Sequence, residues 1–195
     1  TLAFMTDCAV ALMDSLGLDT FSLVGNSQGG AQAMYIALEH PGRVDRLILM
    51  APGGLETRET YMEQRGIRSL MRCIYGPEGI TLEGMLKLFT KQVVDPSRVP
   101  DGVIERRFEV AKTQPRHVFE SLRVDNLEER LSEIACPTLG FWGTGDLFCP
   151  PSGAPKLAGR IPDCRVVTIN RCGHWVMVEH PELFDRTCLD FLRHG

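Results

Sequence analysis

Residues 23–30 read Leu-Val-Gly-Asn-Ser-Gln-Gly-Gly, an apolar run that meets the pattern Gly-x-Ser-x-Gly. The segment 21–24 contains aromatic and β-branched residues, which favour a strand in a buried parallel sheet. Residues 31–38 continue with good helix formers. The stretch therefore predicts a strand that turns into a helix within about two residues, with a serine at the turn.

A turn this sharp holds its central residue in a strained conformation, and a side chain there crowds its neighbours. We expect Gly25 and Gly29 to relieve that crowding. Ser27 would then be exposed above the sheet, with the positive end of the following helix beneath it. This arrangement is a nucleophile elbow, and the simpler alternative is a serine that only caps the helix.

A serine hydroxyl is a poor nucleophile near neutral pH and needs an imidazole and a carboxylate behind it. The apolar run 138–142 ends in a glycine-rich turn that carries Asp146. The next predicted strand, 165–169, leads into a loop that carries His174. Because the carboxyl ends of parallel strands meet at one edge, we expect Ser27, Asp146 and His174 to meet there.

Simpler interpretations of the acid and the base stay open. Asp146 can be an ordinary turn aspartate, and His174 can be a structural histidine. Other carboxylates that compete for the acid role precede a strand or fall in the last helix: Asp163, Asp185 and Asp190. The remaining histidines follow no predicted strand end: His40, His117, His180 and His194.

The composition is that of an ordinary globular domain, with 195 residues, 44% hydrophobic and 24% charged. A net charge of −4 argues against a nucleic-acid partner. The sequence has no apolar stretch of membrane-spanning length and no signal segment, so no membrane association is expected. Seven cysteines without a Cys-x-x-Cys pair favour reduced thiols in the cytoplasm. No residue cluster indicates a metal, and we expect no cofactor.

Individual cysteines are expected to serve as small apolar residues or to lie near the site. Cys8, Cys136 and Cys188 are predicted to lie in the core. Cys149, close to Asp146, could line a pocket. A cysteine nucleophile is disfavoured because no cysteine occupies the elbow.

The chain divides into a core and a helical insertion. We predict a first core segment at 1–54, a lid at 55–124 and a second core segment at 125–195. The lid pattern is helical, broken by glycine and proline, with no convincing strand. Its positively charged stripe is interpreted as a solvated helix face, with steering of an anionic substrate as the alternative: Arg65, Arg68 and Arg72.

The chain order serine, aspartate, histidine is that of the α/β hydrolases. The fold class is therefore α/β, the C-terminal part of an α/β-hydrolase sheet with an inserted helical lid. Such sheets have further strands before the elbow, and a loop among them supplies one oxyanion N–H group. Because the elbow comes after about twenty residues here, we expect those strands to be missing and the backbone N–H of Gln28 to be the donor present. This chain alone is expected to be poorly active or inactive.

Several motifs together resemble the meta-cleavage product hydrolases. They are the elbow at 24–30, Leu-Ile-Leu-Met-Ala-Pro-Gly-Gly-Leu at 47–55, Cys-Gly-His-Trp at 172–175 and Glu-His at 179–180. The resemblance covers nearly the whole chain and is weakest in the lid. It implies a serine-dependent cleavage of a carbon–carbon bond in 2-hydroxy-6-oxo-2,4-dienoates, which are ring-opened aromatic catabolites. It also implies a small-molecule substrate and self-association as a homo-oligomer.

The same resemblance implies substrate-binding residues. Asn26, Arg107 and Trp175 match the positions that hold the 2-oxo-carboxylate end, and Phe148 matches a pocket aromatic residue. Arg106, about 100° further round a helix, is expected to face elsewhere. The alternatives are a solvated charge for Arg107 and plain core packing for Phe148.

Three functions remain open on the sequence. The first is the carbon–carbon hydrolase, and the second is a carboxylesterase on the same scaffold, because a triad alone does not choose between an ester and a ketone. The third is an inactive fragment that acts only as a folded module.

Overall fold

A parallel sheet of four strands lies at the centre of the computed structural model, which describes residues 1–121 and 123–194. The strands occur in the order of the chain: β1 (Phe21–Asn26), β2 (Val44–Met50), β3 (Thr138–Gly143) and β4 (Cys164–Ile169). The register pairs Asn26 with Met50 and Gly143 with Ile169, so the strands end at a common edge. The strands predicted at 21–24, 138–142 and 165–169 lie within two residues of β1, β3 and β4. The predicted α/β fold is confirmed.

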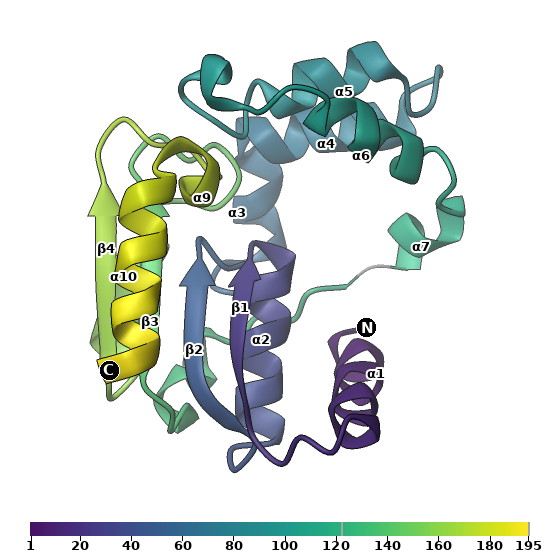
Figure 1. Cartoon of the computed structure of the whole chain (residues 1–195). Coiled ribbons are helices and arrows are strands. Elements are labelled where there is room, and N and C mark those ends of the chain that lie inside the picture. Colours follow the sequence, from purple (N-terminus) through teal and green to yellow (C-terminus); the bar gives the residue numbers. More distant parts are fainter. Residues whose placement is uncertain (122, 195) are drawn as a thin grey trace.

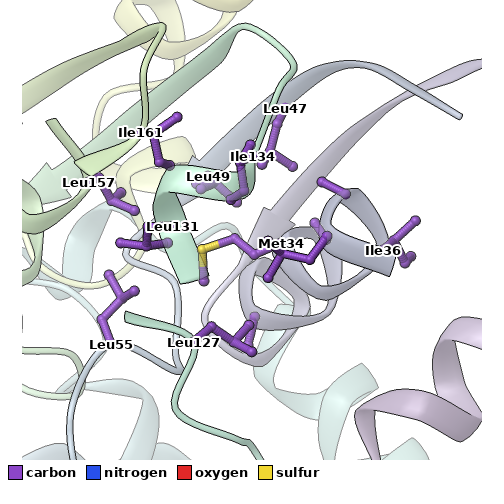
Figure 2. Close-up of a cluster of buried hydrophobic side chains, with 14 of the residues drawn as sticks. Met34, Ile36, Leu47, Leu49, Leu55, Leu127, Leu131, Ile134, Leu157 and Ile161 are labelled. Carbon is purple, nitrogen blue, oxygen red and sulfur yellow. The ribbon is translucent and has the colours of Figure 1, made fainter. Parts of the chain in front are cut away.

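Helices cover both faces of the sheet. On one face, α2 (Gln28–Glu39), the 3-10 helix η2 (Glu128–Glu133) and α8 (Gly153–Arg160) pack against Leu47 and Leu49 of β2. Figure 2 shows Met34 among leucines of this cluster, such as Leu49, Leu127 and Leu131. On the other face, α10 (Pro181–His194) packs against Ile48. A fully buried aliphatic side chain of this kind contributes roughly 1.5–3 kcal/mol.

The first helix, α1 (Leu2–Ser15), packs against α2 with only part of its apolar side. Leu2 is buried, whereas Leu12 is 53% and Leu16 is 61% exposed. The prediction that Cys8 belongs to the core is wrong, because the helix turns this residue toward solvent. Both other cysteines predicted for the core are buried: Cys136 and Cys188.

Between β2 and β3 the described chain is helical and contains no strand. Besides η2, the elements are α3 (Arg58–Glu63), α4 (Arg65–Tyr75), α5 (Leu82–Phe89), η1 (Pro96–Arg98), α6 (Val103–Ala111) and α7 (Arg116–Ser121). Figure 1 shows α4, α5 and α6 beyond the arrowheads of the strands, over the carboxyl edge of the sheet. The three arginines of the predicted stripe are exposed on α4.

Two features of the helices were not predicted. The chain breaks between α3 and α4 at Gln64, although no glycine or proline stands there. The cause is tertiary, because the N–H of Gly66 donates to the carbonyl of Leu147 (2.8 Å) and thereby sets the start of α4. A short helix, α9 (Val176–Glu179), follows the histidine loop. Of the helices in the described ranges, none is long and apolar enough to span a bilayer.

Candidate active site

The elbow serine is held in a strained conformation. Ser27 has φ 56° and ψ −119°, a region that L-residues rarely adopt. A side chain at Gly25 would overlap the carbonyl group of Gly29, so glycine is required there. The same expectation for Gly29 is wrong, because an added Cβ there meets no atom within 4 Å. The second close approach is at Gly30, whose Cβ would lie 2.7 Å from that of Pro52.

Backbone hydrogen bonds fix the elbow against the end of β2. The N–H of Ser27 donates to Met50 (3.0 Å), and the carbonyl of Ser27 accepts from Gly53 (2.8 Å). The N–H of Gln28, at the start of α2, has no acceptor among the described residues, as the geometry of a helix N-terminus leads one to expect. It is therefore available to a bound oxyanion.

The predicted acid and base form a buried pair. Oδ2 of Asp146 lies 2.7 Å from Nδ1 of His174, and the side chains are 0% and 2% exposed. Oδ1 of Asp146 accepts from the N–H groups of Phe148 (2.7 Å) and Cys149 (3.0 Å). The aspartate thus shapes its own turn and also orients the imidazole. The ring of Phe148 stacks on that of His174 with centroids 5.0 Å apart.

The hydroxyl of Ser27 does not complete this relay in the structure. Within the part of the chain that is described, no hydrogen bond joins Ser27 to His174, and the hydroxyl interacts with the thiol of Cys149 instead. Burial raises the pKa of Cys149 well above its ordinary value, and the charge of Asp146 adds to this shift. The Ser27 hydroxyl therefore faces a neutral thiol.

Asn26, predicted to bind substrate, connects two loops of the site. Its Nδ2 donates to the carbonyl of Met50 (3.0 Å) and to that of His174 (3.2 Å). The side chain therefore ties the elbow to the histidine loop.

Arg107 lies over an aromatic pair beside the histidine. Its guanidinium carbon is 4.8 Å from the ring centroid of Trp175 and 5.5 Å from that of Phe89. The two rings meet edge to face at 4.9 Å. Burial lowers the pKa of Arg107, and no carboxylate in the described ranges pairs with it. Arg106 lies against Gly102 instead, so the two arginines face different ways, as predicted.

Sequence reasoning assigned no role to Glu179, although its side chain is buried at 2% exposure. A signal was present, because this carboxylate closes the otherwise apolar run at 175–178. Nothing in the sequence alone indicated what it contacts.

As for metals, the described ranges hold no group of three His, Cys, Asp or Glu side chains placed to bind an ion.

Comparison with curated proteins gives relatives that include two named hydrolases. The chain is 38% identical over 193 residues to a 2-hydroxy-6-oxononadienedioate/2-hydroxy-6-oxononatrienedioate hydrolase of Comamonas testosteroni. It is 37% identical over 193 residues to a 2-hydroxy-6-oxo-6-phenylhexa-2,4-dienoate hydrolase of Burkholderia cepacia. Both alignments cover 94% of this chain, which spans 66% of the length of each relative.

Comparison with solved structures finds the same fold in known hydrolases. The fold superposes on a meta-cleavage product hydrolase from Pseudomonas fluorescens IP01 with a TM-score of 0.84 and 27% identity, covering 99% of this chain and 72% of that one. An esterase from Exiguobacterium antarcticum, at 20% identity and a TM-score of 0.81, shares the fold over 98% of this chain and 74% of its own. The model of the alpha/beta hydrolase family matches residues 1–187. The chain belongs to the α/β hydrolase family.

Proposed function

We propose that this protein is a serine-dependent hydrolase that cleaves a carbon–carbon bond of 2-hydroxy-6-oxo-2,4-dienoates formed by aromatic ring cleavage. The observation that carries the proposal is Arg107, a cation without a carboxylate partner in the described chain, stacked on Trp175 beside His174. A dienoate brings the carboxylate that this guanidinium lacks, and a planar guanidinium binds a carboxylate through two parallel hydrogen bonds. The names of the curated relatives support this substrate class.

In the proposed mechanism, the substrate is first ketonised, which gives the leaving carbon an electron sink. The hydroxyl of Ser27 then turns from Cys149 toward Nε2 of His174, which takes its proton as the oxygen attacks the 6-carbonyl carbon. Asp146 keeps the imidazole oriented and stabilises its charged form. Catalytic hydrogen bonds are often absent or long before substrate binds, so the resting rotamer of Ser27 is compatible with this role.

The tetrahedral intermediate carries its negative charge on the former carbonyl oxygen, toward which the N–H of Gln28 would donate. Its collapse breaks the bond between C5 and C6. The electron pair passes through the conjugated enone to the 2-oxo oxygen, and the proton held by His174 returns to this leaving group, which becomes a 2-hydroxy-2,4-dienoic acid. Water, activated by His174, then hydrolyses the ester on Ser27 and releases the second acid.

The cellular location of the protein, its self-association and its partners are also proposals. We infer that the protein works in the cytoplasm, supported by seven free cysteines. We infer that it self-associates, as the resemblance to the meta-cleavage product hydrolases implies. Its proposed partners are otherwise limited to the small-molecule substrate. Sedimentation of the purified protein under reducing conditions measures its oligomeric state, and a monomer at micromolar concentration would contradict self-association.

The deciding experiment compares two substrates in the full-length natural protein. In Arg107→Ala, kcat/KM for a dienoate should fall roughly tenfold to hundredfold, because a charge-assisted contact is lost. Hydrolysis of a neutral p-nitrophenyl ester should change little. Loss of dienolate absorbance in a stopped-flow instrument measures the first reaction, and release of nitrophenolate measures the second.

Arg106→Ala is the matched control, since it removes the adjacent arginine and should leave both reactions unchanged. Ser27→Ala should abolish both. Equal small effects of Arg107→Ala on both substrates would support a carboxylesterase instead. Failure of the wild-type protein to turn over either substrate would support a non-catalytic module.

A further inference from the structure

A buried carboxylate joins the histidine loop to the lid. Glu179 ends α9, and its Oε1 accepts hydrogen bonds from the N–H groups of Val94 (2.8 Å) and Asp95 (3.0 Å). Its Oε2 accepts from the N–H of Gly173 (2.5 Å). These three donors are backbone groups, the Cys172 thiol also interacts with the carboxylate, and Gly173 immediately precedes His174. The carboxylate is therefore placed to hold main chain in position.

The lid segment in this contact is residues 92–95, which we call the lid crossing; it connects α5 to η1. The carbonyl of Gln92 accepts from the N–H of His174 (2.7 Å) and from that of Trp175 (3.1 Å). The lid crossing therefore bonds to the backbone of the histidine loop both directly and through Glu179. In Figure 1, α9 lies at the carboxyl end of the sheet, on the side of the lid.

The segments joined by these hydrogen bonds also pack closely against one another. A Cβ at Gly173 would lie 2.6 Å from the carbonyl oxygen of Gln92. A Cβ at Gly145, in the turn of the catalytic aspartate, would lie 2.8 Å from Cγ2 of Val94. The N–H of Gly145 donates to the carbonyl of Cys172 (2.8 Å). The aspartate turn, the histidine loop and the lid crossing thus pack at main-chain distance.

We propose that Glu179 is a positioning residue that fixes the backbone of His174 by tying it to the lid crossing. The inference rests on the proposed function, in which His174 is the base. A carboxylate suits the task because its two oxygens accept all three N–H groups. Glutamine offers one carbonyl oxygen and an amide group that cannot accept, so Glu179→Gln leaves at least one buried N–H without a partner.

The first test measures the hydrogen bonds and needs no reaction. In the wild-type protein the amides of Gly173, Val94 and Asp95 should exchange with deuterium far more slowly than exposed loop amides. In Glu179→Gln the exchange of these amides should accelerate about tenfold or more, whereas in Glu182→Gln it should not change. Glu182 is the matched control because it lies three residues further on and is exposed. Loop-like exchange of these amides in the wild-type protein overturns the proposal, even if the variant does not fold.

The second test measures the consequence for the base. The Nδ1 proton shared with Asp146 should give a low-field proton resonance, and Glu179→Gln should broaden or shift it while the melting curve stays cooperative. Phosphonylation of Ser27 by a fluorophosphonate, which needs His174 but no dienoate, should slow about tenfold to hundredfold. Unchanged phosphonylation and an unchanged resonance in a folded variant overturn the proposal.

The two proposals can fail separately. If the wild-type protein is phosphonylated but does not cleave dienoates, the proposed substrate is wrong and the role of Glu179 is still measured. If dienoates are cleaved and Glu179→Gln leaves exchange, resonance and phosphonylation unchanged, the positioning role alone is wrong. If Glu182→Gln has the same effects as Glu179→Gln, the positioning role is also wrong, because the loss of a negative charge from this region would then explain the effects.

Discussion

Gly25 and Gly29 flank the same serine, but the backbone around them requires glycine at only one position. A Cβ at Gly25 would overlap the carbonyl group of Gly29 at the start of α2. That part of the backbone cannot move without distorting the turn. Gly29 points its missing side chain toward open space. The motif pattern could predict the turn and the strained serine. It could not predict which glycine is compressed, because that depends on how α2 sits against β1.

We predict opposite outcomes for the same substitution at these two sites. Gly25→Ala should lower the free energy of unfolding by about 2 kcal/mol or more, because the methyl group overlaps backbone. Gly29→Ala should leave it unchanged or raise it by up to about 1 kcal/mol, because alanine favours a helix. Urea denaturation followed by circular dichroism measures both. Equal destabilisation by the two variants would contradict the explanation.

Residues with a local signal could be placed from the sequence, and those with a purely tertiary role could not. Asp146 and His174 each follow a recognisable strand, so their meeting at one edge was predictable. Glu179 acts through three backbone groups, two of them more than eighty residues away in the chain. Cys149 was expected near the site, but its interaction with Ser27 depends on a rotamer that no pattern specifies.

At the scale of elements, strands and breaks with glycine or proline were predictable because their causes are local. The start of α4 was not, because it is set where Gly66 meets the aspartate turn. A Cβ at Gly66 would lie 2.5 Å from the ring of Phe148 and 2.7 Å from the carbonyl of Leu147. Helix α4 thus packs directly against Phe148, whose ring stacks on that of His174.

We therefore expect Gly66→Ala to displace α4 and with it Phe148. The kcat for the dienoate should fall about tenfold or more, because the imidazole loses its stacked neighbour and its fixed orientation. The melting temperature should change by only a few degrees, since the sheet core is untouched. Gly159→Ala is the control, being another helical glycine, with no atom within 4 Å of the added Cβ. A similar loss of activity in both variants would contradict this account.

At the scale of the whole molecule, two buried thiols and one half-buried thiol make the free energy of unfolding fall at alkaline pH. Burial raises the pKa of Cys164 and Cys188 to about 11 and that of Cys172 to about 12. Nearby carboxylates add to each shift: Asp163, Asp185 and Glu179. Since the folded pKa is above the unfolded one, this stabilisation is complete below about pH 8.5 and is lost as pH rises through 11 to 12.

Cys188, on α10 and away from the site, provides the measurement. The difference in unfolding free energy between the wild-type protein and Cys188→Ala should shrink by about 1–2 kcal/mol from pH 7 to pH 10, because the wild-type thiol ionises only when unfolded. Cys8→Ala is the control, because that side chain is exposed and folding buries little of it. A difference for Cys188→Ala that is independent of pH would contradict the linkage.

The helical segment between β2 and β3, which we predict to act as a lid, is held unevenly against the site. Main-chain hydrogen bonds hold the start of α4 and the lid crossing against the aspartate turn and the histidine loop, whereas α6 reaches the histidine loop through the side chain of Arg107 on Trp175. If the proposed lid opens, we expect α6 to move away from the sheet while α4 stays in place. Such a movement would separate the guanidinium from the indole. The fluorescence of Trp175 would then change with every admission of a substrate, giving an optical record of entry that precedes the chemistry.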